Sequence, residues 1–150
     1  MIAFDDIAVG EKFTSSSRTV FDADIVAFAG ISGDFNRLHI DDVFAASTIH
    51  KRRIAHGMLI ASIVSGLRSR LDDYAMIGFM ETQRRFVAPV FPGDTITVTY
   101  EVIEARRSKS RPDTGVVTLD VVVTKQTGET VQTGRDTLLI ESNSRGENEH

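Results

Sequence analysis

The sequence contains no cysteine, and this absence removes several kinds of chemistry together. Disulfides, zinc sites built from thiolates and cysteine nucleophiles are all excluded. No apolar run approaches the roughly 20 residues that a membrane-spanning helix needs. The basic residues form no extended tract and the formal net charge is −4, so electrostatics do not favour a nucleic-acid partner.

Several catalytic motifs are absent as well. There is no Gly-x-x-x-x-Gly-Lys-[Ser/Thr] phosphate loop, and "GISG" lacks the spacing of a dinucleotide fingerprint. His39, His50 and His56 do not form the His-Glu-x-x-His motif of metalloproteases, and we predict no metal site. No Gly-x-Ser-x-Gly elbow is present, which argues against acyl transfer to a serine.

What is present fits one globular domain. Apolar residues make up 41% and charged residues 25% of the 150 residues, as in ordinary soluble domains. The N-terminus "MIAFDDIAVGEKF" is acidic and lacks the apolar region of a signal peptide, so we predict a cytoplasmic protein. The polar end, "SNSRGENEH", is predicted to be a disordered tail. We therefore expect a single domain at residues 1–141 and a tail at 142–150.

Helical periodicity dominates the first half of the chain. Asp22 is predicted to cap a helix that stops at "GISGD", and Asp41 is predicted to cap a short second one. The longest predicted helix, "AHGMLIASIVSGLRSRL", spans Ala55 to Leu71. Most of its positions are small or apolar, which predicts burial on most sides.

The second half alternates with a period of two. "TITVTYEV" and "VVTLDVVVTK" each place apolar side chains on one face, as half-buried strands do. "QTGE", with Gly128, is predicted to be a hairpin turn, and an earlier strand is predicted from Met76 to Phe86. Strands joined by tight turns predict an antiparallel sheet with one apolar face to cover. The predicted fold is α+β, a curved antiparallel sheet wrapped around the central helix.

"SGDFNRLHIDD" places Asp34 and His39 within one short polar loop. A neutral histidine can take a proton from water near pH 7. An aspartate in a dry pocket can hold a proton to donate, because burial disfavours the anion. Together they suit the addition of water to a polarised double bond, or its removal. By spacing alone, the same residues fit better a turn-forming aspartate and a half-buried structural histidine.

Gly57 lies at the start of the predicted central helix, in "AHGM". Backbone N–H groups at a helix N-terminus lack partners and carry partial positive charge. A glycine there lets a ligand approach the backbone, which suits a carbonyl oxygen that gains negative charge. An ordinary glycine in a first helical turn is the plain alternative.

These stretches resemble a known family. "SGDFNRLHIDDVFAAST" followed by "RIAHGMLIASIVSGL" is similar to the MaoC-like (R)-specific enoyl-CoA hydratases and dehydratases of the hotdog superfamily. The family signature is approximately Gly-Asp-x-Asn-Pro-x-His followed by Ala-His-Gly-Met. "FDDIAVGEKF" and "FVAPVFPGDTITV" extend the resemblance over about Phe4 to Ile140.

The resemblance implies a hotdog fold and a homodimer, or a dimer of dimers, with active sites near the subunit interface. It implies that Asp34 and His39 hold the reacting water and that the Gly57 N–H binds the thioester oxygen. Asn36 is expected to shape the loop above the site, and Ser62 to support it. No metal or redox cofactor is implied; coenzyme A or phosphopantetheine enters only as part of an acyl-CoA or acyl-carrier substrate.

Two departures from the family pattern involve arginine. Arg37 and Arg53 stand where the family usually has proline, which stiffens a loop. The loop is then either freer or held by other contacts, and Arg37 is also placed to meet an acidic group of the substrate. Lys51, Arg52 and Arg53 form a basic cluster that is either a contact for the anionic carrier or solvated surface charge.

We predict a hydro-lyase that interconverts trans-2-enoyl and (R)-3-hydroxyacyl thioesters. A thioesterase on the same fold is one alternative, since it also needs a water and an oxyanion donor. The other is a non-catalytic acyl-binding subunit of a mixed dehydratase. The presence of both Asp34 and His39 argues against that role.

Overall fold

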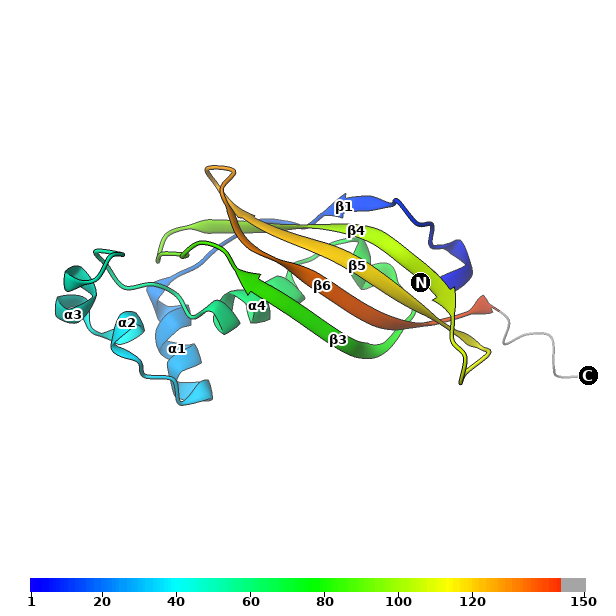
Figure 1. Cartoon of the computed structure of the whole chain (residues 1–150), viewed down its shortest axis with the longest axis horizontal. Coiled ribbons are helices and arrows are strands. Elements are labelled where there is room, and N and C mark those ends of the chain that lie inside the picture. Colours follow the sequence, from blue (N-terminus) through cyan, green and yellow to red (C-terminus); the bar gives the residue numbers. More distant parts are fainter. Residues whose placement is uncertain (144–150) are drawn as a thin grey trace, which may run out of the picture.

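Six antiparallel strands form one long, curved sheet in the computed structural model, which describes residues 1–143. The order of the main strands is β1-β4-β5-β6-β3, and the short β2 also pairs with β4 (Figure 1). The strands are β1 (Lys12–Thr14), β2 (Arg18–Thr19), β3 (Met76–Phe86), β4 (Thr95–Arg107), β5 (Thr114–Lys125) and β6 (Thr130–Glu141). The predicted strand at Met76–Phe86 and the turn at Gly128, which has a φ of +85°, are both confirmed.

The helices gather on one side and at one end of this sheet (Figure 1). Helix α4 (Gly57–Gly66) lies along the sheet, while α1 (Asp22–Ser32), α2 (Arg37–Ile40) and α3 (Asp42–Ser47) cluster beyond its end. Two 3-10 turns, η1 (Phe4–Asp6) and η2 (Arg70–Asp73), complete the elements. This is the predicted antiparallel sheet wrapped around a central helix.

The core lies between the concave face of the sheet and α4. On β4, Ile96, Val98 and Tyr100 alternate with partly exposed threonines and are fully buried, as the period of two predicted. Ile60 and Val64 of α4 belong to the same buried cluster. Burial of this kind stabilises the fold by roughly 25 cal/mol per Å² of apolar surface removed from water.

The central helix is shorter than predicted. Ala55 lies in an extended stretch that precedes the helix, where its N–H donates to the carbonyl of Val90. Leu67 leaves the helix with a ψ of 128°, and Ser69 then caps the 3-10 turn η2. The predicted burial on most sides is also too broad, because α4 buries only Leu59, Ile60 and Val64.

The prediction of a cap at Asp22 was displaced by one residue. Phe21 is the N-cap of α1, and its N–H donates to the Asp24 carboxylate over 2.8 Å. Asp22 is instead the first helical residue, where its negative charge still favours the helix N-terminus.

The ordered fold continues two residues past the predicted boundary at 141. Ser142 is buried, and both its hydroxyl and the N–H of Asn143 donate to the carboxylate of Asp5. The rest of the predicted tail, residues 144–150, lies outside the described residues. Within residues 1–143, no helix combines the length and the hydropathy that crossing a membrane requires.

Candidate active site

The loop that carries Asp34 and Asn36 is held by hydrogen bonds from backbone N–H groups to side-chain oxygens. Gly33 ends α1 with a φ of +77°, a left-handed conformation that glycine adopts without strain. Asp34 Oδ1 accepts the N–H of Asn36 over 3.1 Å. Asn36 Oδ1 in turn accepts the N–H of Leu38 over 3.0 Å and so caps α2. These bonds set the direction in which α2 leaves the loop.

Arg37 is the first residue of α2 and is held by contacts within the chain. Its Nε donates to Asp41 Oδ2 over 3.0 Å, and its guanidinium lies 4.3 Å from the centre of the Phe44 ring. Asp41 also caps α3, as predicted, and the Phe44 N–H and then Arg37 lower the pKa of Asp41. Of the three alternatives for Arg37, a freer loop, a loop held by other contacts or a contact with the substrate, the structure therefore favours the second.

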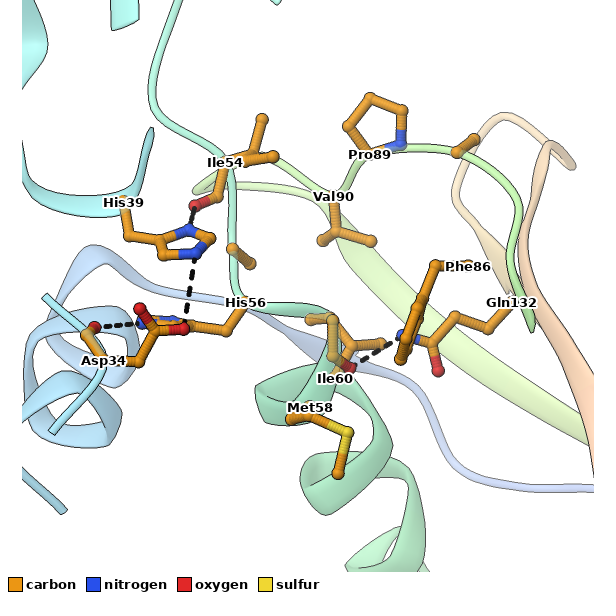
Figure 2. Close-up of a pocket in the computed structure, with 13 residues that line it drawn as sticks. Asp34, His39, Ile54, His56, Met58, Ile60, Phe86, Pro89, Val90 and Gln132 are labelled. Carbon is orange, nitrogen blue, oxygen red and sulfur yellow. Dashed lines mark hydrogen bonds and ion pairs between the residues drawn. The ribbon is translucent and has the colours of Figure 1, made fainter. Parts of the chain in front are cut away.

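Asp34 and His39 face each other across a short gap. Asp34 Oδ2 lies 3.8 Å from His39 Nε2, and Figure 2 shows the two side chains pointing toward each other. His39 Nδ1 lies 2.8 Å from the carbonyl oxygen of Ile54. Because a carbonyl only accepts, Nδ1 carries the hydrogen, and in the neutral ring Nε2 then presents its lone pair toward the carboxylate. A water oxygen about 2.8 Å from both atoms fits this separation.

His56 is the residue that the sequence analysis missed. Its ring stacks on that of His39, with centroids 3.8 Å apart and planes inclined by 27°. His56 Nε2 donates to the backbone carbonyl of Asp34 over 2.9 Å, and the residue is only 2% exposed. One side chain therefore contacts both Asp34 and His39. The available signal was its position in "AHGM", directly before Gly57.

The cluster of Asp34, His39 and His56 has the composition of a metal site but not its geometry. One candidate ligand atom from each residue lies within 4.8 Å of the others. The two imidazole planes are nearly parallel, however, so the in-plane lone pairs of the rings do not converge on one point. A metal bound by both rings needs such convergence. The arrangement suits proton transfer better.

Gly57 opens α4 beside this pair, in a pocket of about 280 Å³. As the first helical residue, it has an N–H without an intrahelical partner. Gln132 donates to the Gly57 carbonyl over 2.8 Å, and the Phe86 ring lies so close that a Cβ on Gly57 would meet it at 2.7 Å. The pocket walls are otherwise mostly apolar (Figure 2), and they include Ile54, Met58, Ile60, Ala88, Pro89 and Val90.

The Asp34 side chain is 51% exposed in the single chain. The proposed proton donor needs a dry pocket around this carboxylate, and the isolated subunit does not supply one. His39, by contrast, is largely buried. Exclusion of water from Asp34 therefore requires something outside this chain, either bound substrate or another subunit.

Ser62 does not line this pocket. Its hydroxyl donates to the carbonyl of Met58 over 2.7 Å, one helical turn back. It lies on the exposed face of α4, in a separate hollow shared with Phe79 and Met80. The structure thus places the residue apart from Asp34 and His39.

The three basic residues of the predicted cluster have separate environments. Lys51 occupies an exposed turn with a φ of +66°, and Arg52 stacks on Phe91 with 4.1 Å to the ring centre. Arg53 turns inward and donates to Asp22 and Asp42 over 2.5 Å each. These hydrogen bonds, to Asp22 first and then Asp42, raise the pKa of Arg53. Its guanidinium is therefore engaged within the chain and is not free to meet a carrier.

Comparisons with known proteins agree with this fold. The family described as "MaoC like domain" matches residues 6–127. The chain is 38% identical over 134 residues to the (R)-specific enoyl-CoA hydratase of Aeromonas caviae, which covers 89% of this chain and 96% of that protein.

Solved structures extend the same likeness. The MaoC-like dehydratase of Rhodospirillum rubrum superposes with a TM-score of 0.79 at 28% identity, covering 95% of this chain and 98% of that one. A double-hotdog protein of Mycobacterium tuberculosis superposes with a TM-score of 0.85 at 21% identity, over 96% of this chain and 45% of that one. The last match bears on the fold alone and confirms the predicted hotdog architecture.

Proposed function

The chain belongs to the MaoC-like domain family and is a lyase of the enoyl-CoA hydratase type, and we propose that Asp34 and His39 activate its water. The reaction interconverts a trans-2-enoyl thioester and an (R)-3-hydroxyacyl thioester. The observation that supports this use of the two residues is their 3.8 Å gap, with the His39 Nε2 lone pair turned toward it.

In the hydration direction, His39 Nε2 takes a proton from water as the water oxygen bonds to C3. The electron pair of the C2–C3 double bond moves toward the thioester, whose oxygen becomes negative. Asp34 then gives to C2 a proton that it holds only once substrate or a second subunit has excluded water from its carboxyl group. Transfer of the proton from His39 to Asp34 across the gap resets the pair, so atoms and charge balance.

The Gly57 N–H is proposed to stabilise the developing thioester oxyanion. The helix N-terminus supplies both the donor and partial positive charge, and the apolar walls of the pocket strengthen that interaction. Gln132 restrains the same residue from its carbonyl side. No step requires a metal or a redox cofactor.

The direct test is the purified protein with crotonyl-CoA and longer enoyl-CoAs, following loss of the enoyl absorbance. Formation of the (R)-3-hydroxyacyl product supports the proposal. Release of free thiol from a saturated acyl-CoA would instead identify a thioesterase. Binding without turnover that a partner protein restores would identify an acyl-binding subunit. A chain-length series on CoA and carrier-protein substrates then defines the acyl group.

Removal of metal ions is expected to leave the activity unchanged, because the two stacked imidazoles do not converge on a common metal position. Protein dialysed against excess EDTA should retain its kcat, and elemental analysis should find no stoichiometric transition metal. Loss of activity that a divalent ion restores would contradict this prediction.

We also propose that the protein works as a homodimer formed through β3 and the outer face of α4. Strand β3 ends the sheet order, so one of its edges has unpaired backbone groups. Met58 is 60% and Met80 57% exposed, and Phe79 beside them is also exposed. A second copy paired here would cover these side chains and extend the sheet.

Met80→Glu is expected to shift the protein toward monomer and to lower its activity. An unpaired carboxylate at a buried interface costs at least about 1.4 kcal/mol, or tenfold in dissociation constant. Sedimentation velocity over a concentration series measures the shift. Val9→Glu, in the loop before β1 at the opposite edge of the sheet, is the matched control. An unchanged dimer in Met80→Glu would place the interface elsewhere.

A further inference from the structure

Arg53 joins three elements around the candidate dyad. Its Nη1 donates to Asp22 at the start of α1, and its Nε donates to Asp42 at the start of α3, each over 2.5 Å. The same Nη1 lies 3.2 Å from the backbone carbonyl of His39, near the end of α2. The Arg53 side chain is only 18% exposed, whereas those of Asp22 and Asp42 are 55% and 82% exposed, so the guanidinium is shielded from water and the two carboxylates are not.

The residue after Arg53 holds the other parts of the same histidine. The Ile54 N–H donates to the carbonyl of Leu38 over 3.1 Å, and the Ile54 carbonyl accepts from His39 Nδ1. Arg53 therefore binds the backbone carbonyl of His39, and Ile54 binds its ring. A displacement of this short segment would move the imidazole and also the acceptor that sets its tautomer.

Three acceptors at fixed directions require the planar fork of an arginine. The guanidinium offers five N–H donors in one rigid plane, whereas a lysine ammonium is a single point on a flexible stem. Charge-assisted bonds of this kind are shorter and stronger than neutral ones. Arg53 stands where the resembled family usually has proline, so a side-chain clamp replaces a stiff backbone ring at this point of the chain.

We propose that Arg53 is a positioning residue of the hydration reaction: by clamping α1, α3 and the His39 backbone, it keeps His39 Nε2 facing Asp34. Arg53 does not line the candidate pocket, so it acts through His39. The inference rests on the proposed function, since it assigns a role to a residue behind the proposed base.

Kinetics of Arg53→Gln test the clamp. Without the guanidinium, the His39 imidazole should leave its position. A misplacement of about 1 Å lowers kcat by about ten- to a hundredfold. KM should stay nearly constant, because Arg53 does not line the pocket. Arg53→Lys keeps the charge and should recover only part of kcat. Arg18→Gln removes a single, more exposed ion pair to Asp24 on α1; Arg18 does not line the pocket, and this variant should retain the wild-type kcat.

A kcat for Arg53→Gln within about threefold of the wild type overturns the proposal, as does an equal loss in Arg18→Gln. If Arg53→Gln does not fold, the double variant Asp22→Asn/Asp42→Asn removes the two anionic acceptors and leaves Arg53 in place. It should show the same fall in kcat, and an unchanged kcat in it likewise overturns the proposal.

Nitrogen-15 NMR of the His39 ring separates this inference from the proposed function. In the wild type, Nδ1 should be protonated and Nε2 unprotonated, because Ile54 accepts from Nδ1. In Arg53→Gln, a mixture of tautomers is expected. An unchanged spectrum overturns the positioning role. Absence of hydratase activity in the wild type overturns the proposed function, while the NMR result still decides whether Arg53 orients His39.

Discussion

Asp34→Asn and His39→Gln are each expected to lower kcat by about 10²- to 10⁴-fold, the usual contribution of a positioned acid or base. Asparagine keeps the oxygen that accepts the Asn36 N–H, so the loop geometry survives while the acid is lost. The variant therefore separates a catalytic carboxylate from one that only forms a turn. Steady-state kinetics with crotonyl-CoA measure the effect, and circular dichroism verifies folding.

The double variant extends this test. If the two residues act on one water as a unit, removing both should cost little more than the worse single change. His50→Gln and Asp120→Asn are matched controls, because neither residue lines the pocket, and both should keep wild-type kcat. Nearly full activity in Asp34→Asn and His39→Gln would show that the dyad assignment is wrong.

Gly57→Ala is expected to lower kcat/KM by about 10²- to 10³-fold, the cost of an oxyanion donor that the substrate oxygen can no longer reach. The new Cβ would lie 2.7 Å from Cδ1 of Phe86, so the ring must move from its place in the pocket wall. Phe86 is exposed and can swing toward solvent, so folding should survive. The methyl group would still stand where the substrate oxygen must approach the N–H.

Gly66→Ala is the matched control on the same helix. A Cβ at Gly66 meets nothing within 4 Å, so this variant should keep full activity and equal or higher thermal stability. The double variant Gly57→Ala/Phe86→Ala tests the cause of the loss. If removing the Phe86 ring restores activity, displacement of the ring and not a blocked N–H caused the loss, and the predicted steric block at the Gly57 N–H is wrong.

Sequence patterns predicted the sheet well because the alternation of apolar and polar residues along a strand shows directly which face is buried. Alternation along β4 and β5 identified the buried face, and turn residues marked the hairpin at Gly128. The central helix was harder. Apolar periodicity continues through Leu67 and Leu71, and both are buried, but in an extended residue and a 3-10 turn. Periodicity records which side chains are buried and not which backbone conformation buries them.

Some residues of the candidate site were predicted from the sequence, and others were seen only in the structure. Asp34, His39 and Gly57 were found because short spacing and motif resemblance are properties of the chain itself. His56 and Arg53 were missed or misassigned because their roles depend on partners distant in sequence: the carbonyl of Asp34 for one, Asp22 for the other. The sequence around a histidine, or around an arginine in a basic run, does not show whether the side chain is exposed to solvent or held by partners inside the fold.

The order of amino acids was thus sufficient to establish the sheet around a helix and the loop that holds Asp34 and His39. The contacts that hold Asp34 and His39 in place were decided only by the tertiary structure. The stack of His56 on His39, the clamp of Arg53 and the Phe86 ring over Gly57 each join segments that only the sheet and the helix cluster bring together. The direction of a guanidinium or the face of an imidazole is set by packing in three dimensions, and no local pattern encodes it.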